Sequence, residues 1–285
     1  MSLDLPIISV NGIEGASVSP LDRGFAYGDG MFETCRYENG RIPLWSYHLE
    51  RLLYSADRLK IKINELQLQH YLNQILQRPC IPNNAVIKVQ ITRGVGGRGY
   101  RLPVDESPTY CIGLFSGDSL DSDAFRKGVD VRVCDLRLSK NPLLAGIKHL
   151  NRLEHILARA EWQGEFAEGL LFDVDDYLVE ATVSNVFIIK DRELLTPDLS
   201  FSGVAGVMRR VIIEIIAPRL NLPVNVKKIS IKELTVADEL FLSNSVFGVW
   251  PVNNIDGFSK HLTHEITHQI QKTLIELLYA EKISF

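Results

Sequence analysis

The chain has 285 residues, of which 46% are hydrophobic and 23% are charged, and its formal net charge is −4. This length suits two packed domains, and the negative charge argues against a surface that binds nucleic-acid phosphates. The first ten residues have no basic stretch before a long apolar run, and Glu214 interrupts the most apolar later stretch. We therefore expect no signal peptide and no membrane span.

The four cysteines are distributed without any CxxC pair. Such usage is typical of a reducing compartment and favours neither a zinc ribbon nor a disulfide framework. The composition therefore predicts a cytoplasmic globular protein without a nucleic-acid or membrane partner. The cysteines are Cys35, Cys80, Cys111 and Cys134.

The first third of the chain predicts a small α+β domain, residues 1–115. An Asn39-Gly40 dipeptide between two short apolar runs favours a β-hairpin. The polar, acidic stretch 116–124 has no periodicity and is the predicted linker. The expected elements are strands 31–37 and 41–45, a helix over 48–59, and strands 86–92 and 109–115.

The remaining residues, 125–285, predict a larger second domain. Its expected elements are strand 129–133, helix 150–162, strands 169–174, 178–183, 184–190 and 193–197, helix 204–217, strand 237–245, and a final helix after Leu262. Helical spacing predicts that two of these helices bury an apolar face. The faces are Leu150, Leu153, Ile156, Leu157 and Ala160 in the first helix, and Ile266, Ile270 and Leu274 in the last.

Two sequence motifs match well-known patterns without their usual context. Residues 94–99 satisfy GxGxxG, but Pro103 and Pro108 follow where a dinucleotide site needs a helix, so we expect a glycine-rich loop. His264 and His268 complete an HExxH pattern. No further histidine follows to serve as a third zinc ligand, so we expect surface histidines and keep a zinc site as a minor alternative.

Lys148 ends an apolar approach, residues 141–148, directly before a predicted helix. Burial favours the neutral form of a lysine, since a low dielectric penalises its charge. A neutral amine is the nucleophile that condenses with a carbonyl cofactor. Lys148 is therefore a candidate catalytic residue, although a lysine whose amine reaches water gives the same pattern.

Glu180 is a carboxylate in a strand-rich stretch that continues into hydroxyl and amide side chains. One interpretation is an exposed acid at a strand end. The other is a carboxylate that keeps a pyridine nitrogen protonated, which makes that ring a strong electron sink. Ser184, the helix start at 203–206 and the Asn244-Ser245 pair suit a phosphate, because helix-start amides and short hydroxyls bind anions.

Together these segments resemble the fold-type IV pyridoxal-phosphate enzymes, whose relatives include D-amino-acid aminotransferases. Within that family the chain is most similar to the aminodeoxychorismate lyases. The resemblance runs along most of the chain, and Gly96 to Tyr100 and Lys148 to Glu154 are the pieces closest to the lyases. The other pieces are Asp22 to Gly24, Tyr27 to Thr34, His48 to Leu52, Thr92 to Gly94, Asn141 to Ile147, Glu180, Ser184-Asn185, Gly203 to Arg209 and Leu242 to Ser245.

The resemblance implies a two-domain α+β / α/β fold, with a small N-terminal domain and a larger C-terminal domain built on a mixed sheet or barrel. It implies pyridoxal 5'-phosphate as cofactor, with Lys148 as the Schiff-base lysine and Glu180 on the pyridine nitrogen. It also implies a homodimer and a small-molecule substrate, aminodeoxychorismate, which is cleaved to 4-aminobenzoate and pyruvate in folate biosynthesis. The phosphate is expected on Arg51, the amides of Val207 and Met208, and Ser245, with Ser184, Asn185 and Asn244 nearby.

Substrate contacts are expected from Arg98, Thr34 and Tyr100. Arg98 suits a carboxylate because a guanidinium matches its geometry, although a solvated loop arginine is an equal alternative. Thr34 is a weaker candidate, because a strand threonine commonly faces its neighbours.

Two rival functions remain. D-amino-acid aminotransferases resemble this chain but carry tyrosine at the position of Phe32 and histidine at that of Tyr100. Branched-chain aminotransferases usually carry tyrosine at the position of Leu153. These differences favour the lyase over an aminotransferase, and intact Lys148 and Glu180 argue against a non-catalytic binding protein.

Overall fold

The computed structural model describes residues 6–79, 81–118, 120, 122–258 and 262–280, and these residues divide into two compact units. The first unit contains the described residues of Met1–Ser119 together with Ile147–Asn151. The second contains the described residues of Leu120–Gly146 and of Arg152–Phe285. The sequence predicts one division, at residues 116–124, and it does not predict that Ile147–Asn151 joins the first unit.

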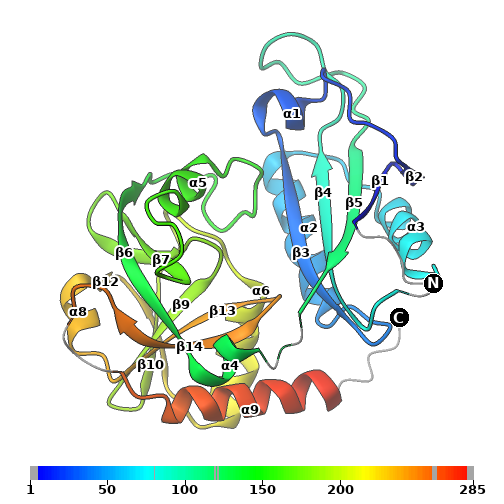
Figure 1. Ribbon diagram of the computed structural model, residues 1–285. Coiled ribbons are helices and arrows are strands. Elements are labelled where there is room, and N and C mark those ends of the chain that lie inside the picture. The colour runs from blue at the N-terminus through cyan, green and yellow to red at the C-terminus, as the bar shows by residue number, and fades with distance from the viewer. Residues whose placement is uncertain (1–5, 80, 119, 121, 259–261, 281–285) are drawn as a thin grey trace. The chain divides into compact units, whose positions relative to one another are not determined.

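In the described part of the first unit, five strands form one antiparallel sheet in the order β2-β1-β5-β4-β3 (Figure 1). The predicted strands 31–37, 86–92 and 109–115 are confirmed as the three long ones. The strands are β1 (Ile7–Val10), β2 (Ile13–Glu14), β3 (Gly30–Glu38), β4 (Asn84–Thr92) and β5 (Thr109–Ser116).

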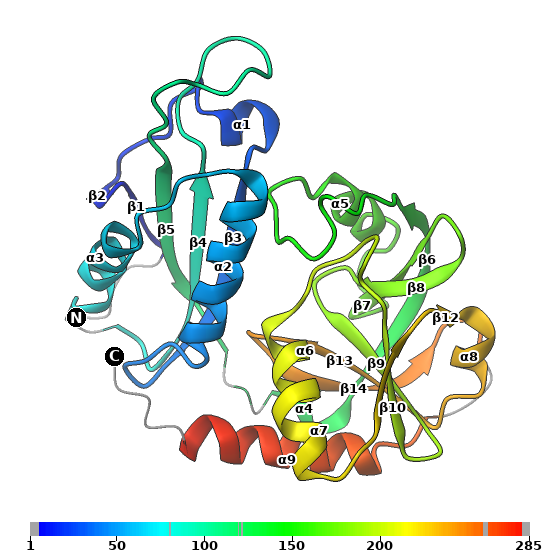
Figure 2. The same cartoon turned by 180° about the vertical axis from the view of Figure 1, so that it is seen from behind.

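Helices α2 (Trp45–Leu59) and α3 (Glu65–Leu76) cover one face of this sheet, as Figure 2 shows from the helix side. The predicted helix over 48–59 is confirmed within α2. Alternate residues of the strands point into the helices, as the two-residue repeat of a strand requires. Leu52 and Leu72 pack there with Cys35 and Ile87. A short helix, α1 (Arg23–Tyr27), precedes β3.

The predicted strand over 41–45 is wrong. Asn39 and Gly40 do turn the chain, with φ of 49° and 87°, but only Arg41 pairs back, with Glu38. Ile42 then joins the core, and Leu44 adopts φ 60° as α2 begins at Trp45. The strand that pairs with β3 along its length is β4, and residues 42–44 instead lead into α2.

In the second unit, nine described strands form a mixed sheet in the order β11-β10-β9-β13-β14-β6-β7-β8-β12. The pairs β10–β11, β14–β6 and β6–β7 are parallel and the others are antiparallel. The strands are β6 (Val129–Leu138), β7 (Glu168–Asp173), β8 (Tyr177–Ala181), β9 (Asn185–Lys190), β10 (Glu193–Pro197), β11 (Val224–Lys227), β12 (Ile229–Ser230), β13 (Glu239–Asn244) and β14 (Gly248–Ile255). The predicted mixed sheet is confirmed, and so are the predicted strands of this region.

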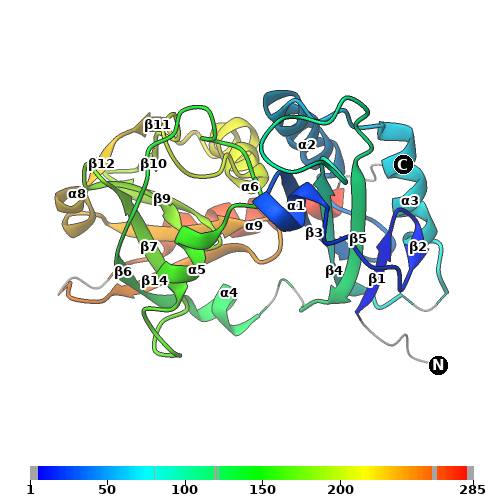
Figure 3. The ribbon, with the colours of Figure 1, turned by 90° about the horizontal axis from the view of Figure 1, so that it is seen from above.

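The longest helical segment between these strands runs from Val207 to Arg219 as α6 (Val207–Val211), a π-helical turn (Ile212–Ile216) and α7 (Ala217–Arg219). Pro218 lacks an N–H and crowds the carbonyl four residues before it, which explains a widened turn there. Helix α9 (Glu265–Ala280) packs on β13 and β14 (Figure 3). Ile266, Ile270 and Leu274 are buried, which confirms the predicted final helix and its buried face. The unit also contains α4 (Asp123–Lys127), α5 (Leu153–Arg159) and α8 (Ile231–Thr235).

The predicted helix over 150–162 is shorter, and its predicted buried face is wrong. Within α5 only Ala158 is buried, whereas Leu153, Ile156 and Leu157 are 73%, 60% and 61% exposed. Ala160 is exposed as well. Helical spacing identifies an apolar face, but it does not say whether that face meets this chain's own core.

For the two incomplete motifs, the expected glycine-rich loop is confirmed, and the expected surface position holds for one of the two histidines. Residues 94–99 form a loop between β4 and β5, with no helix after them. His268 is exposed, whereas His264 is partly buried and its Nε2 lies 3.0 Å from the carbonyl oxygen of Val252. Cys35, Cys111 and Cys134 carry free thiols, and Cys80 lies outside the described residues. No helix in the described part of the chain is both long and apolar enough to cross a membrane.

Candidate active site

Lys148 lies on the open edge of β3, in the segment that returns to the first unit. Phe32 N donates to Lys148 O at 2.9 Å, and Leu150 N donates to Gly30 O at 3.0 Å. The Nζ atom lies 4.4 Å from the centroid of the Phe32 ring, and the residue is partly buried. The edge of the sheet therefore fixes the backbone of Lys148, and an aromatic ring lies beneath its amine.

The turn before β3 makes this docking possible. Gly28 has φ 67°, and a Cβ atom there would lie 2.7 Å from Oδ1 of Asn151. Asn151 in turn donates from Nδ2 to the carbonyl of Gly28 at 3.0 Å. A Cβ on Gly30 would lie 2.4 Å from a backbone oxygen of β4. Glycine at 28 and 30 therefore lets residues 147–151 approach closely.

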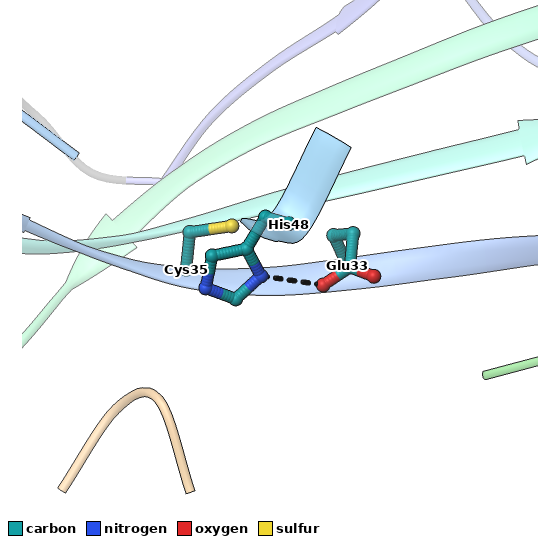
Figure 4. A group of neighbouring side chains, drawn as sticks. All are labelled: Glu33, Cys35 and His48. Atoms are coloured by element: carbon teal, nitrogen blue, oxygen red, sulfur yellow. Dashed lines mark hydrogen bonds and ion pairs between the residues drawn. The ribbon is translucent and has the colours of Figure 1, made fainter. Parts of the chain in front are cut away.

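A buried polar cluster lies between β3 and α2 of the same unit, and Figure 4 draws three of its residues, Glu33, Cys35 and His48. Nδ1 of His48 is 2.7 Å from Oε2 of Glu33. Arg51 donates hydrogen bonds to both oxygens of that carboxylate, at 2.7 and 2.5 Å. Burial alone would raise the pKa of Glu33, but the charge of Arg51 and the His48 hydrogen bond lower it to about 2. Burial lowers the pKa of His48, so this imidazole is neutral.

The same cluster includes the thiol of Cys35. Among the described residues, Glu33, Cys35 and His48 are the one group of histidine, cysteine and acidic side chains close enough to share a metal ion. Burial raises the pKa of the Cys35 thiol well above its ordinary value, and the guanidinium of Arg51 already neutralises Glu33. We therefore interpret the cluster as an anchor for Arg51.

Glu180 lies on β8 in the second unit and is buried. Nε2 of His155 is 2.9 Å from its Oε1, and the backbone N of Val204 donates to its Oε2 at 2.8 Å. Burial would raise the pKa of this carboxyl, but these hydrogen bonds and the nearby charges of His155 and Arg152 lower it. Glu180 is therefore an ionised carboxylate with both oxygens held in place.

Ser184 and Asn185 lie at the turn between β8 and β9. The hydroxyl of Ser184 donates to Glu168 at 3.1 Å. Nδ2 of Asn185 donates to Val204 O at 2.9 Å. A Cβ atom on Gly206 would lie only 1.9 Å from Oδ1 of Asn185. Asn185 therefore holds the loop that leads into α6, which begins with Val207 and Met208.

Asn244 ends β13 beside this turn. Its Nδ2 donates to the carbonyl of Val183 at 3.2 Å, and its Oδ1 accepts from the amides of Val246 and Phe247. Ser245 follows and is partly exposed. The second unit thus brings together the predicted residues Glu180, Ser184, Asn185, Val207, Met208, Asn244 and Ser245 through one set of adjoining turns.

The predicted substrate residues all lie in the first unit but on different elements. Thr34 is in β3, opposite Lys88 of β4. Arg98 and Tyr100 lie in the loop between β4 and β5, and both are exposed. The Tyr100 ring meets the ring of Tyr27 edge to face, with centroids 5.5 Å apart.

Two contacts of the candidate site residues are not predicted from the sequence. His155 lies in α5, for which helical spacing predicts only an apolar core face, so its contact with Glu180 is not expected. Glu33 lies in a strand pattern in which alternation marks it as a core position, so a buried carboxylate there is not expected. A helix that carries His48 and Arg51 at i and i+3 over that strand is the signal that could have identified the pair.

Comparison with known proteins identifies the family. The class IV amino-transferase family model matches residues 30–255. The aminodeoxychorismate lyase of Vibrio harveyi is 38% identical over 86% of this chain and 90% of that protein. A putative branched-chain-amino-acid aminotransferase of Methanocaldococcus jannaschii is 32% identical over 90% of each chain. The crystal structure of 4-amino-4-deoxychorismate lyase from Pseudomonas aeruginosa matches with a TM-score of 0.88 at 38% identity, over 98% of this chain and 100% of that one. As its motifs predict, the chain belongs to the class IV aminotransferase family.

Proposed function

We propose that this chain is a pyridoxal-phosphate-dependent lyase that converts 4-amino-4-deoxychorismate to 4-aminobenzoate and pyruvate. The relatives that carry this activity in their names support the proposal, since they align at 38% identity over most of the chain. The structural observation that carries it is Glu180, which is buried, ionised and fixed by His155 and Val204.

The surroundings of Glu180 fit a pyridine cofactor. An ionised carboxylate accepts a hydrogen bond from a protonated ring nitrogen, and a carboxylate that cannot rotate keeps that acceptor in place. When pyridoxal phosphate is bound, its ring supplies an electron sink for charge that develops on the substrate. Glu180 would hold the ring nitrogen, and His155 would orient Glu180.

We assign the phosphate to Arg51, the amides of Val207 and Met208, and Ser245. The first N–H groups of a helical segment lack acceptors within the helix, which suits them to an anion. In the same assignment the side chains of Ser184, Asn185 and Asn244 shape the turns around the phosphate, since each makes a hydrogen bond within these turns.

Lys148 is the residue that we propose moves the proton. Its amine would remove the proton from the amine-bearing ring carbon of the substrate. The carbon–oxygen bond to the enolpyruvyl group then breaks, the ring becomes aromatic, and enolpyruvate takes up a proton to become pyruvate. The docking of residues 147–151 on β3 restricts the backbone of Lys148, which favours a reproducible position for its amine.

The surroundings of Lys148 favour a lyase over a D-amino-acid aminotransferase. Phe32 presents an apolar ring under the amine, where those aminotransferases carry a tyrosine. Arg98, Thr34 and Tyr100 are assigned to the substrate. A guanidinium fork suits the ring carboxylate of aminodeoxychorismate, so Arg98 is the first of the three to test.

An aminotransferase is the second candidate, favoured by a specific observation. A relative named as a branched-chain-amino-acid aminotransferase aligns at 32% identity over 90% of both chains. The early chemistry of the two reactions is shared. Transfer of an amino group from D-alanine or leucine is therefore the activity to test beside lyase activity.

We further propose that two copies of the chain form a cytoplasmic homodimer. Leu153, Ile156 and Leu157 expose their side chains on consecutive turns of α5. An exposed apolar patch of this kind is typical of a protein interface, and a second copy of the chain is the partner proposed here. Light scattering should give twice the chain mass, and Ile156→Glu should shift it toward the monomer.

The experiment that tests the proposed function supplies aminodeoxychorismate to the cofactor-loaded protein. Equal amounts of 4-aminobenzoate and pyruvate should form. Release of 2-oxo acid from D-alanine or leucine, without 4-aminobenzoate, would assign the chain to the aminotransferases. A protein that takes up no cofactor would favour a binding role instead.

A further inference from the structure

The loop between β4 and β5, residues 93–108, is held by side chains from outside it. It lies beside α1 at one end of the sheet of the first unit (Figures 1 and 3). The loop contains four glycines, at 94, 96, 97 and 99, and has no helix or strand of its own. Glycine-rich loops lose much conformational freedom when they order, so a defined loop shape requires compensating contacts.

Asp29, in the turn before β3, is the centre of these contacts. Its Oδ2 accepts from Nε of Arg23 and from Nε of Arg93, each at 2.8 Å, and its Oδ1 accepts from Nη2 of Arg93 at 3.0 Å. Burial would raise the pKa of Asp29, but hydrogen bonds and charge from Arg93 and then Arg23 lower it. Both arginines are nearly inaccessible, with 4% and 3% exposure.

Arg93 and Arg23 bind different parts of the first unit. Arg93 donates to Asp29, to Glu106 at 2.9 Å, and to the carbonyls of Leu59 and Lys60 at the end of α2. These bonds tie the base of the loop to the body of the unit. Arg23 instead reaches into the loop itself, where its Nη1 donates to the carbonyls of Gly99 at 3.0 Å and of Arg101 at 3.5 Å.

Further contacts of α1 hold the same part of the loop. A Cβ on Gly96 would lie 2.6 Å from Cδ of Arg23, so the aliphatic stem of Arg23 packs directly on the loop. The Arg23 guanidinium lies 5.2 Å from the Tyr27 ring centroid. The Tyr27 hydroxyl accepts from the amide of Gly99 at 3.2 Å. Arg23 and Tyr27 thus contact the loop at Gly96, two residues before Arg98, and at Gly99, directly after it.

From this geometry we infer that Arg23 is a positioning residue that presents Arg98 to the substrate carboxylate. This inference rests on the proposed substrate role of the loop. A buried guanidinium is costly unless its hydrogen bonds are made, and Arg23 makes them to Asp29 and to the loop carbonyls. Pre-ordering Arg98 removes an entropic cost from substrate binding, so the effect falls on KM more than on kcat.

The test compares Arg23→Gln and Tyr27→Phe with wild type. For Arg23→Gln we expect KM to rise about tenfold and kcat to change less than about threefold, because one charged anchor of the loop is lost. Tyr27→Phe removes only the acceptor of the Gly99 amide and should give a smaller rise. Arg101→Gln is the matched control, since it removes an exposed loop charge but keeps the carbonyl that Arg23 binds.

Hydrogen exchange supplies a readout that does not depend on turnover. Exchange over residues 94–107 should become faster in Arg23→Gln and Tyr27→Phe, and it should be unchanged in Arg98→Gln and Arg101→Gln. A double variant, Arg23→Gln with Arg98→Gln, should have the KM of Arg98→Gln alone, because Arg23 acts through Arg98. Additive effects on KM, or unchanged loop exchange, would overturn the inference.

Failure of the proposed function gives a different result. In that case the wild-type protein makes no 4-aminobenzoate, and the same comparison of KM values uses D-alanine or leucine as substrate. If Arg23→Gln does not fold, Tyr27→Phe decides the matter. Faster exchange in that variant with a raised KM supports the inference, and faster exchange with an unchanged KM rejects it.

Discussion

The amine of Lys148 lies over the face of the Phe32 ring, with Nζ 4.4 Å from the ring centroid. The same two residues are joined through the backbone, because Phe32 N donates to Lys148 O at 2.9 Å. One strand position therefore sets both the path of the chain at Lys148 and the surface beneath its amine.

Phe32→Tyr tests whether that surface selects the reaction. The change adds a hydroxyl near Lys148, as in the D-amino-acid aminotransferases, and a hydroxyl offers a partner to the α-carboxylate of an amino acid. We expect 4-aminobenzoate formation to fall about tenfold and transamination of D-alanine to rise. Phe32→Leu removes the ring without adding a hydroxyl, and it should not raise transamination. An unchanged ratio of the two activities in Phe32→Tyr would exclude this role.

Glu180→Gln should keep cofactor binding but lose most turnover. An amide is neutral, so it stabilises a protonated pyridine nitrogen poorly, and the ring becomes a weaker electron sink. We expect kcat to fall at least about a hundredfold, measured as 4-aminobenzoate formed at saturating cofactor. Glu180→Asp retains the charge and should recover part of this loss. Equal losses in the two variants would show that the charge is not what matters.

Glu33 should stabilise the fold in a pH-dependent way. Its pKa is about 2 in the folded chain, against 4.5 ordinarily, so its contribution is present above pH 4.5 and is lost as the pH falls through 2. Glu33→Gln should therefore reduce the free energy of unfolding by about 3 kcal/mol at pH 7 and by about half as much at pH 3. Urea unfolding at both pH values measures the difference.

A surface carboxylate provides the control for Glu33. Glu14 pairs with Arg78 but is about half exposed, so Glu14→Gln should change the free energy of unfolding by less than about 1 kcal/mol. A loss in Glu33→Gln that is the same at pH 3 and pH 7 would contradict the ionised state of Glu33.

Gly206→Ala should weaken the cofactor site with little effect elsewhere. The new Cβ would lie 1.9 Å from Oδ1 of Asn185, which must move and release the loop before α6. We expect the dissociation constant for pyridoxal phosphate to rise about tenfold, because the amides of Val207 and Met208 shift with the loop. Gly164→Ala is the control, since a Cβ there meets nothing within 4 Å. Equal affinities in the two variants would remove this loop from the phosphate site.

Regular patterns made much of the fold predictable. The two-residue repeat identifies β4, and the helical repeat identifies α2 and the buried face of α9, because each of these elements packs within its own unit. The same repeat misleads at α5, where Leu153, Ile156 and Leu157 face outward. The run 41–45 has strand composition, but Leu44 takes a left-handed conformation at the start of α2.

The candidate site was less accessible from the sequence than the fold was. Motifs identify Lys148 and Glu180, but not the docking of 147–151 on the edge of β3, which depends on contacts more than a hundred residues apart in the chain. The motifs also do not predict that Arg51 donates hydrogen bonds to Glu33, or that the hydroxyl of Ser184 donates to Glu168. Such partners are set by which faces meet in the folded chain.

The most direct test of the central claim follows Lys148. Cofactor-loaded wild type and Lys148→Ala should be compared for 4-aminobenzoate formed from aminodeoxychorismate, with borohydride reduction and peptide mass spectrometry to locate the cofactor. We expect equimolar 4-aminobenzoate and pyruvate from wild type, cofactor fixed on Lys148, and a loss of at least about a thousandfold in a folded Lys148→Ala protein. Wild-type turnover in Lys148→Ala, or cofactor fixed on another lysine, would contradict the account.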